Sequence, residues 1–149
     1  IVPEKRAEVT TEGGLNLNKK KSFLIKIINV FKKNNIRVSL FVNPKIMDIV
    51  LSKQVGADCV EIHTGKFCYL HINKKTSKSE FLKIKKSASF AKKIGLEVHA
   101  GHGLDYKTAY MISKIKYISE LNIGHFIIAE SIFVGLKKTI KKFKEIIKN

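Results

Sequence analysis

The feature that most constrains the fold is the regular alternation of apolar strand patterns with amphipathic helix patterns. Val, Ile, Leu and Phe dominate four short segments that we predict as strands, at residues 37–42, 59–64, 96–101 and 117–123. Helical spacing of apolar residues predicts intervening and closing helices at 19–35, 44–53, 79–94, 106–115 and 127–148. Such alternation is typical of an α/β protein with a parallel sheet. We therefore expect one α/β domain over residues 1–149.

The residues that could bind or transform a ligand follow the predicted strands. Residues 1–3 read as the tail of a further strand, and a polar loop with two glycines follows it. Right-handed crossovers bring the carboxyl ends of parallel strands to one edge of the sheet, where such folds bind ligands. The polar and glycine positions expected there are residues 4–14, Asn43, 61–65, 101–103 and 124–125. The pattern by itself fits both a doubly wound sheet and part of a (β/α)8 barrel.

Two glycine–histidine corners stand at these strand ends. His102 lies between Gly101 and Gly103, and Gly124 directly precedes His125. Glycine lets backbone N–H groups approach a ligand closely, and imidazole exchanges protons near neutral pH. The two corners together suggest an enzyme that handles phosphorylated compounds. The alternative for His102 is a loop histidine that caps the following helix.

Composition narrows the functional class. The net charge of +17 would suit a nucleic-acid binder, but the only arginines are Arg6 and Arg37, and the lysines are spread over polar helix faces. No helix-turn-helix, zinc-finger or RNP-type aromatic motif is visible, so we expect no specific nucleic-acid partner. No apolar run approaches the roughly 18 residues that span a bilayer, and no signal peptide is visible. Cys59 and Cys68 form no metal-binding or disulfide pattern, and we expect a cytoplasmic protein.

Five motifs in order along the chain resemble the pyridoxine 5'-phosphate synthase family. They are VPEKRAEVTTEGGL at 2–15, VSLFVN at 38–43, VEIHTG at 60–65, AGHGL at 100–104 and ELNIGH at 120–125. The resemblance covers nearly the whole chain. It implies a (β/α)8 TIM barrel that forms a homo-octamer. It also implies a transferase of vitamin B6 biosynthesis that uses neither a metal nor an organic cofactor. The family condenses 1-deoxy-D-xylulose 5-phosphate with 3-amino-2-oxopropyl phosphate and releases pyridoxine 5'-phosphate, phosphate and water.

The resemblance also implies roles for single residues. His102 matches the proton donor of the family, and Glu61 matches the glutamate that stabilises charged intermediates. Thr10 matches a threonine that contacts the deoxyxylulose phosphate, with a turn or helix-cap hydroxyl as its alternative. The residues that match contacts to the aminooxopropyl phosphate are Gly103, Gly124 and His125. No family role is assigned to His63, for which we expect a structural hydrogen bond.

The resemblance places the chain in the C-terminal part of the barrel, from about the fourth strand. Because a whole barrel takes about 250 residues, the other catalytic groups of the family are expected outside this stretch, and catalysis by the stretch alone is not expected. Glu130 stands where an arginine is expected, just after the second corner. Two alternatives remain: a non-catalytic barrel remnant that binds a phosphorylated ligand, and a basic α/β protein that binds polyanions.

Overall fold

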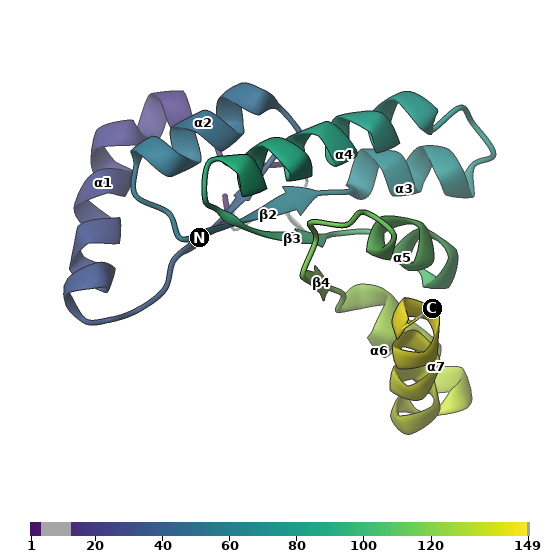
Figure 1. Cartoon of the computed structure of the whole chain (residues 1–149). Helices are drawn as coiled ribbons and strands as arrows, with labels where there is room; N and C mark the ends of the chain where they lie inside the picture. Colours follow the sequence, from purple (N-terminus) through teal and green to yellow (C-terminus); the bar gives the residue numbers. More distant parts are fainter. Residues whose placement is uncertain (4–12, 149) are drawn as a thin grey trace.

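Four parallel strands form the sheet of the computed structural model, which describes residues 1–3 and 13–148. The strands are β1 (Ser39–Val42), β2 (Cys59–His63), β3 (Glu97–Gly101) and β4 (Glu120–Asn122), and they lie side by side in that order (Figure 1). A doubly wound sheet reverses its strand order at a switch point. The unbroken order seen here matches consecutive strands of a (β/α)8 barrel, which the sequence pattern alone could not separate from a doubly wound sheet.

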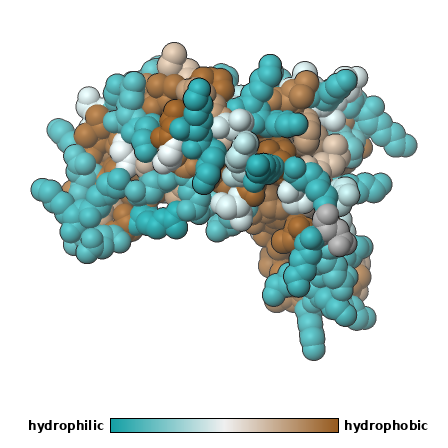
Figure 2. All heavy atoms as spheres, in the orientation of Figure 1, coloured by the Kyte–Doolittle hydropathy of each residue, from teal (hydrophilic) through white to brown (hydrophobic). Residues whose placement is uncertain are grey.

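Seven helices precede, connect and follow the strands in the described residues. They are α1 (Leu17–Lys33), α2 (Ile46–Gln54), α3 (Gly65–Ile72), α4 (Lys78–Lys93), α5 (Tyr106–Ser113), α6 (His125–Val134) and α7 (Leu136–Lys148). Helices α2 and α4 lie on the same side of the sheet, whereas α6 and α7 project from its β4 end (Figure 1). The space-filling view shows that the part of the molecule formed by α6 and α7 projects away from the rest (Figure 2). Among the described residues, no helix is long and apolar enough to cross a membrane.

The two faces of the sheet differ in chemistry. On β2, the side chains of Val60 and Ile62 are completely buried in the core beneath the helices. Burial of such a side chain contributes about 1.5–3 kcal/mol. Glu61 and His63 alternate with them and therefore point to the opposite face, where both are half-buried. Glu61 thus lies on the inner face of the sheet, away from the helical covering.

One predicted loop is a helix. The sequence pattern predicts a loop at residues 65–78, but α3 starts at Gly65, directly after the end of β2. The helix has only eight residues, and it buries Phe67 and Cys68 against the core. So short a segment contains little more than two turns of apolar periodicity, which is too little for the pattern to indicate a helix.

The single closing helix predicted at 127–148 is instead the pair α6 and α7. Gly135 separates them with a φ of 86°, a left-handed conformation that favours glycine. Phe133, which lies just before the break, is 84% exposed. Phe143 of α7 remains buried and packs on the rings of Tyr106 and Phe126. The fourth strand is also shorter than predicted, because only residues 120–122 pair with β3.

Residues 1–3 extend the sheet pattern beyond β1. The backbone nitrogen of Ile1 donates to the carbonyl of Ser39, and the Phe41 N–H donates to the carbonyl of Ile1. The Leu15 N–H donates to the Phe41 carbonyl just before α1 begins. The first residues therefore lie alongside β1, as expected for the tail of a preceding strand.

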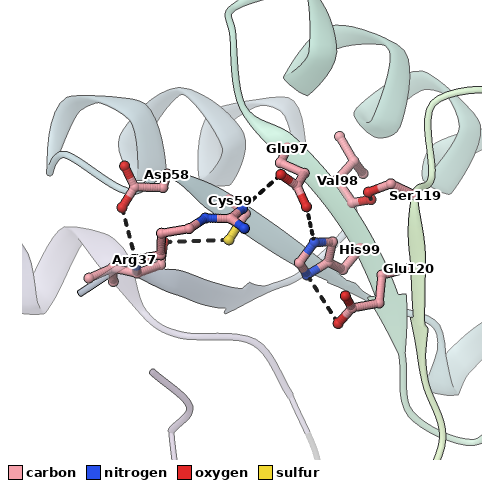
Figure 3. A network of polar contacts seen from close by, with 9 residues as sticks. Arg37, Asp58, Cys59, Glu97, Val98, His99, Ser119 and Glu120 are labelled. Carbon is pink, nitrogen blue, oxygen red and sulfur yellow. Dashed lines mark hydrogen bonds and ion pairs between the residues drawn. The ribbon is translucent and has the colours of Figure 1, made fainter. Parts of the chain in front are cut away.

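A network of charged side chains ties the amino ends of the strands together (Figure 3). Arg37 Nη2 lies 2.7 Å from Glu97 Oε2, and His99 Nε2 lies 2.9 Å from the other carboxylate oxygen of Glu97. Asp58 accepts a hydrogen bond from the Val38 N–H. The exposed Arg37–Glu97 ion pair contributes little to stability by itself. The network joins neighbouring strands at the edge away from the glycine–histidine corners, and it gives His99 a structural role.

Candidate active site

A cavity of about 870 Å³ opens at the carboxyl ends of the strands. It lies between the inner face of the sheet and the start of α6, and it has the size of a small-molecule site. Five of the six site residues predicted from the sequence line it: Glu61, His102, Gly103, Gly124 and His125. The sixth, Thr10, lies outside the described residues. Side chains from three different strand ends thus converge on one space.

Glu61 is held in this cavity by a neighbour that the sequence reasoning did not identify. Its Oε2 accepts a hydrogen bond of 2.7 Å from Nδ2 of Asn122, which ends β4 and also lines the cavity. Burial raises the pKa of Glu61 above its ordinary value, although the Asn122 hydrogen bond works in the opposite direction. A Cβ on Gly101 would overlap the Glu61 carboxylate, so the position of this carboxylate requires glycine at residue 101. The signal for Asn122 was its place in ELNIGH, two residues before Gly124.

We predict that Glu61→Gln stabilises the fold. The folded state raises the pKa of Glu61, so ionisation of this group opposes folding above that pKa and the penalty disappears as the pH falls through it. Glutamine keeps an acceptor for Asn122 without the buried charge. The melting temperature at pH 7–8 should rise, by roughly 2–4 °C for each kcal/mol gained. The difference from the parent should shrink below about pH 4, near the ordinary pKa of a glutamate. A lower melting temperature at pH 8 would contradict this.

His102 occupies an unusual backbone conformation at the mouth of the cavity. Its φ is 79°, and Gly103 follows with a φ of 76°. Left-handed residues other than glycine are uncommon and gather at functional sites. The His102 ring lies 4.9 Å from the ring of His63 and 6.5 Å from that of Phe41, measured between centroids.

The alternative role of His102, a cap for the following helix, is already filled by other residues. Asp105 accepts a 2.7 Å hydrogen bond from the Thr108 N–H, and the Thr108 hydroxyl pairs back to the Asp105 N–H. This capping box satisfies the start of α5 without histidine.

The structural hydrogen bond expected for His63 is not formed. Its Nε2 is buried and has no hydrogen-bond partner in the part of the chain that the structure describes. Desolvation by burial, with the nearby His102 as a smaller cause, lowers the pKa of His63 to about 4. His63 is therefore neutral at physiological pH and packs against the rings of Phe41 and His102.

The second glycine–histidine corner begins α6. Gly124 is the residue before the first helical turn, and no side chain of the described residues caps it. Uncapped N–H groups at a helix start, together with the positive end of its dipole, attract anions. A Cβ on Gly124 would meet nothing within 4 Å, so the corner is open. Glu130 lies farther along α6 and does not line the cavity.

The described residues do not favour a metal site or a reactive thiol. Nowhere in residues 1–3 and 13–148 could a group of three or more His, Cys, Asp or Glu side chains hold a metal ion. Cys59 and Cys68 are free and buried. Burial raises the pKa of the Cys68 thiol to about 11, which keeps it protonated.

Comparisons with known proteins point to one family. The family model described as "Pyridoxal phosphate biosynthesis protein PdxJ" matches residues 1–149. A pyridoxine 5'-phosphate synthase of Pelagibacter ubique is 60% identical over 146 residues, which are 98% of this chain and 61% of that protein. Relatives of the same name are 50% identical in Sulfurihydrogenibium sp. (100% of this chain, 60% of the relative) and 44% identical in Ehrlichia chaffeensis (99% and 59%). The chain spans about three fifths of the length of these curated relatives.

The match runs through the described sheet and through all the residues that line the cavity. The parallel sheet in sequential order agrees with the TIM-barrel fold of this family, of which it forms a part. The chain belongs to the PdxJ family of pyridoxal phosphate biosynthesis proteins.

Proposed function

We propose that the protein is a pyridoxine 5'-phosphate synthase. It would condense 1-deoxy-D-xylulose 5-phosphate with 3-amino-2-oxopropyl phosphate and release pyridoxine 5'-phosphate, phosphate and water. The observation that carries the proposal is the convergence of Glu61, His102, Gly103, Gly124 and His125 on one cavity at the carboxyl edge of the sheet. Barrel enzymes bind and transform their substrates at this edge. Membership of the family supports the same reaction class.

His102 is the proposed proton donor. Formation of an imine, loss of water and closure of the ring each require protons to move, and imidazole does this efficiently near neutral pH. His102 lines the cavity beside Gly103 and is therefore adjacent to the space that the substrates would share. The neutral His63 against it adds no competing positive charge.

Glu61 is the proposed stabiliser of positive charge. Imine intermediates carry a cation, and a half-buried carboxylate attracts it more strongly than a carboxylate in water would. The hydrogen bond from Asn122 fixes the direction of the carboxylate before the substrate arrives. Burial raises the pKa of Glu61, and a cation bound beside it would favour the ionised form.

Gly103, Gly124 and His125 are the proposed contacts for the phosphate of the aminooxopropyl substrate. Backbone N–H groups at the start of α6 and the positive end of its helix dipole suit a phosphate dianion. Thr10 is proposed for the other phosphate on the basis of the family motif alone. The octameric assembly, the cytoplasmic location and the absence of a cofactor remain part of the proposal, and they rest on resemblance to the family.

Complementation tests this function in a cell. The complete gene that encodes this chain should restore growth without added vitamin B6 to a bacterial strain whose own pyridoxine 5'-phosphate synthase gene is deleted. A copy with His102→Ala should restore growth poorly at equal protein level. Failure of the parental gene to support growth, with the protein present and folded, would contradict the proposal.

A further inference from the structure

The turn between β2 and α3 lies directly beneath the first glycine–histidine corner. Thr64 is completely buried there, and its backbone N–H donates a 2.9 Å hydrogen bond to the carbonyl of Gly101. Its hydroxyl lies 2.7 Å from the same carbonyl and 2.6 Å from the carbonyl of His102. The hydroxyl has a single proton to donate, and the shorter of its two contacts is the one to the His102 carbonyl.

The carbonyl of His102 receives a second contact from α3. Cys68 Sγ lies 3.8 Å from this oxygen, and the buried thiol keeps its proton. Two side chains of one short segment therefore hold the peptide that follows His102. This peptide leads into Gly103, so its orientation also sets where the Gly103 N–H points.

The backbone at His102 needs such support. A φ of 79° is unfavourable for a residue with a Cβ and persists only where the surroundings enforce it. Without the hydroxyl of Thr64, the partly buried carbonyl of His102 would lose its closest donor, and the loop would be free to relax toward an ordinary negative φ. The imidazole would then leave its place in the cavity.

Gly65 leaves space for the ring of His102 at the start of α3. A Cβ on Gly65 would lie 2.7 Å from Cδ2 of His102 and 2.8 Å from Nε2 of His63. Real Cβ atoms do not come so close, so both rings, or the backbone at Gly65 itself, would have to shift. The segment Thr64–Gly65 thus controls both the backbone and the side chain of His102.

We propose that Thr64 is a positioning residue, which fixes the strained backbone of His102 through its hydroxyl, and that Gly65 completes this support by leaving room for the imidazole. The inference deepens the proposed function and rests on it, because it assumes that His102 moves protons in the synthase reaction. Thr64 itself does not line the cavity and has no direct part in binding.

The test compares Thr64→Val with Thr64→Ser in the protein produced from its complete gene. Valine keeps the shape and removes the hydroxyl, whereas serine keeps the hydroxyl. We expect Thr64→Val to lower kcat by about 10- to 100-fold, the scale of a small misplacement of a reacting group. The KM values for both substrates should change little, and Thr64→Ser should retain a kcat close to that of the parent.

Thr139→Val is the matched control. Thr139 is as completely buried as Thr64, and its hydroxyl also donates to a backbone carbonyl, that of Gly135, but it lies in α7 and does not line the cavity. Its kcat should stay near the parental value. An unchanged kcat in Thr64→Val, or equal losses in Thr64→Val and Thr64→Ser or Thr139→Val, would overturn the inference.

Two further variants keep the result interpretable. Should Thr64→Val fail to fold, Gly65→Ala tests the same support, with a lower kcat expected and a parental kcat overturning the inference. His102→Ala is measured alongside. If His102→Ala is inactive while Thr64→Val and Gly65→Ala are normal, only the positioning role fails. If His102→Ala is itself fully active, the proposed site fails.

Discussion

Replacing His102 by alanine should lower kcat for pyridoxine 5'-phosphate formation by about 10²- to 10⁴-fold, the usual contribution of a positioned acid or base. Neither of the two histidines on the described strands, His63 and His99, is placed to replace it. His63 is buried with its pKa lowered to about 4, and His99 belongs to the charged network at the opposite edge of the sheet. The rate should be measured with both substrates saturating, so that binding does not mask the chemical step.

Two controls separate the imidazole from its backbone. His102→Asn places a residue that tolerates a positive φ at this position, yet it supplies no titratable group. It should be nearly as inactive as the alanine variant. His71→Ala changes a histidine on α3 that does not line the cavity, and it should retain activity. Near-normal product formation by His102→Ala would remove His102 from the mechanism.

Replacing Gly124 by aspartate should weaken binding of the aminooxopropyl phosphate substrate and raise its KM roughly 100-fold, because a like charge beside the phosphate costs several kcal/mol. The position accepts a side chain sterically, since a Cβ there would meet nothing within 4 Å. Its φ of −113° also suits residues other than glycine. The loss should therefore come from charge at the start of α6, and thermal stability should change little.

Gly124→Asn is the matched control, because it has the size of aspartate without the charge. It should keep most of the affinity for the phosphorylated substrate.

The same pair of variants tests the alternative of a polyanion-binding protein. Binding to DNA at low salt should depend on the widespread lysines and stay unchanged in Gly124→Asp. Equal KM values for the aspartate and asparagine variants would show that this corner does not hold a phosphate.

The strand–helix alternation and the faces of the strands were predictable from sequence because they follow short-range periodicity. Val60 and Ile62 alternate with Glu61, so the strand pattern puts Glu61 on the face opposite to these two side chains. The carboxyl-edge rule for parallel sheets then predicts that Glu61, His102 and Gly124 share one region. All three line the same cavity.

Other features depend on three-dimensional contacts that periodicity does not contain. The break at Gly135 splits a helix pattern that otherwise looks continuous, because apolar residues at helical spacing occur on both sides of it. The partner of Glu61 comes from Asn122, sixty-one positions later in the chain. The support of His102 by Thr64 depends equally on the pairing of β2 with β3, which brings their ends together.

The reaction itself provides the most direct test of the proposed synthase activity. The protein from its complete gene is incubated with 1-deoxy-D-xylulose 5-phosphate and 3-amino-2-oxopropyl phosphate, and pyridoxine 5'-phosphate and inorganic phosphate are quantified together. We expect equal amounts of both products, formation only when both substrates are present, and loss of both products in His102→Ala. No pyridoxine 5'-phosphate from the folded protein, or equal yields from the parent and His102→Ala, would contradict the proposed activity and site.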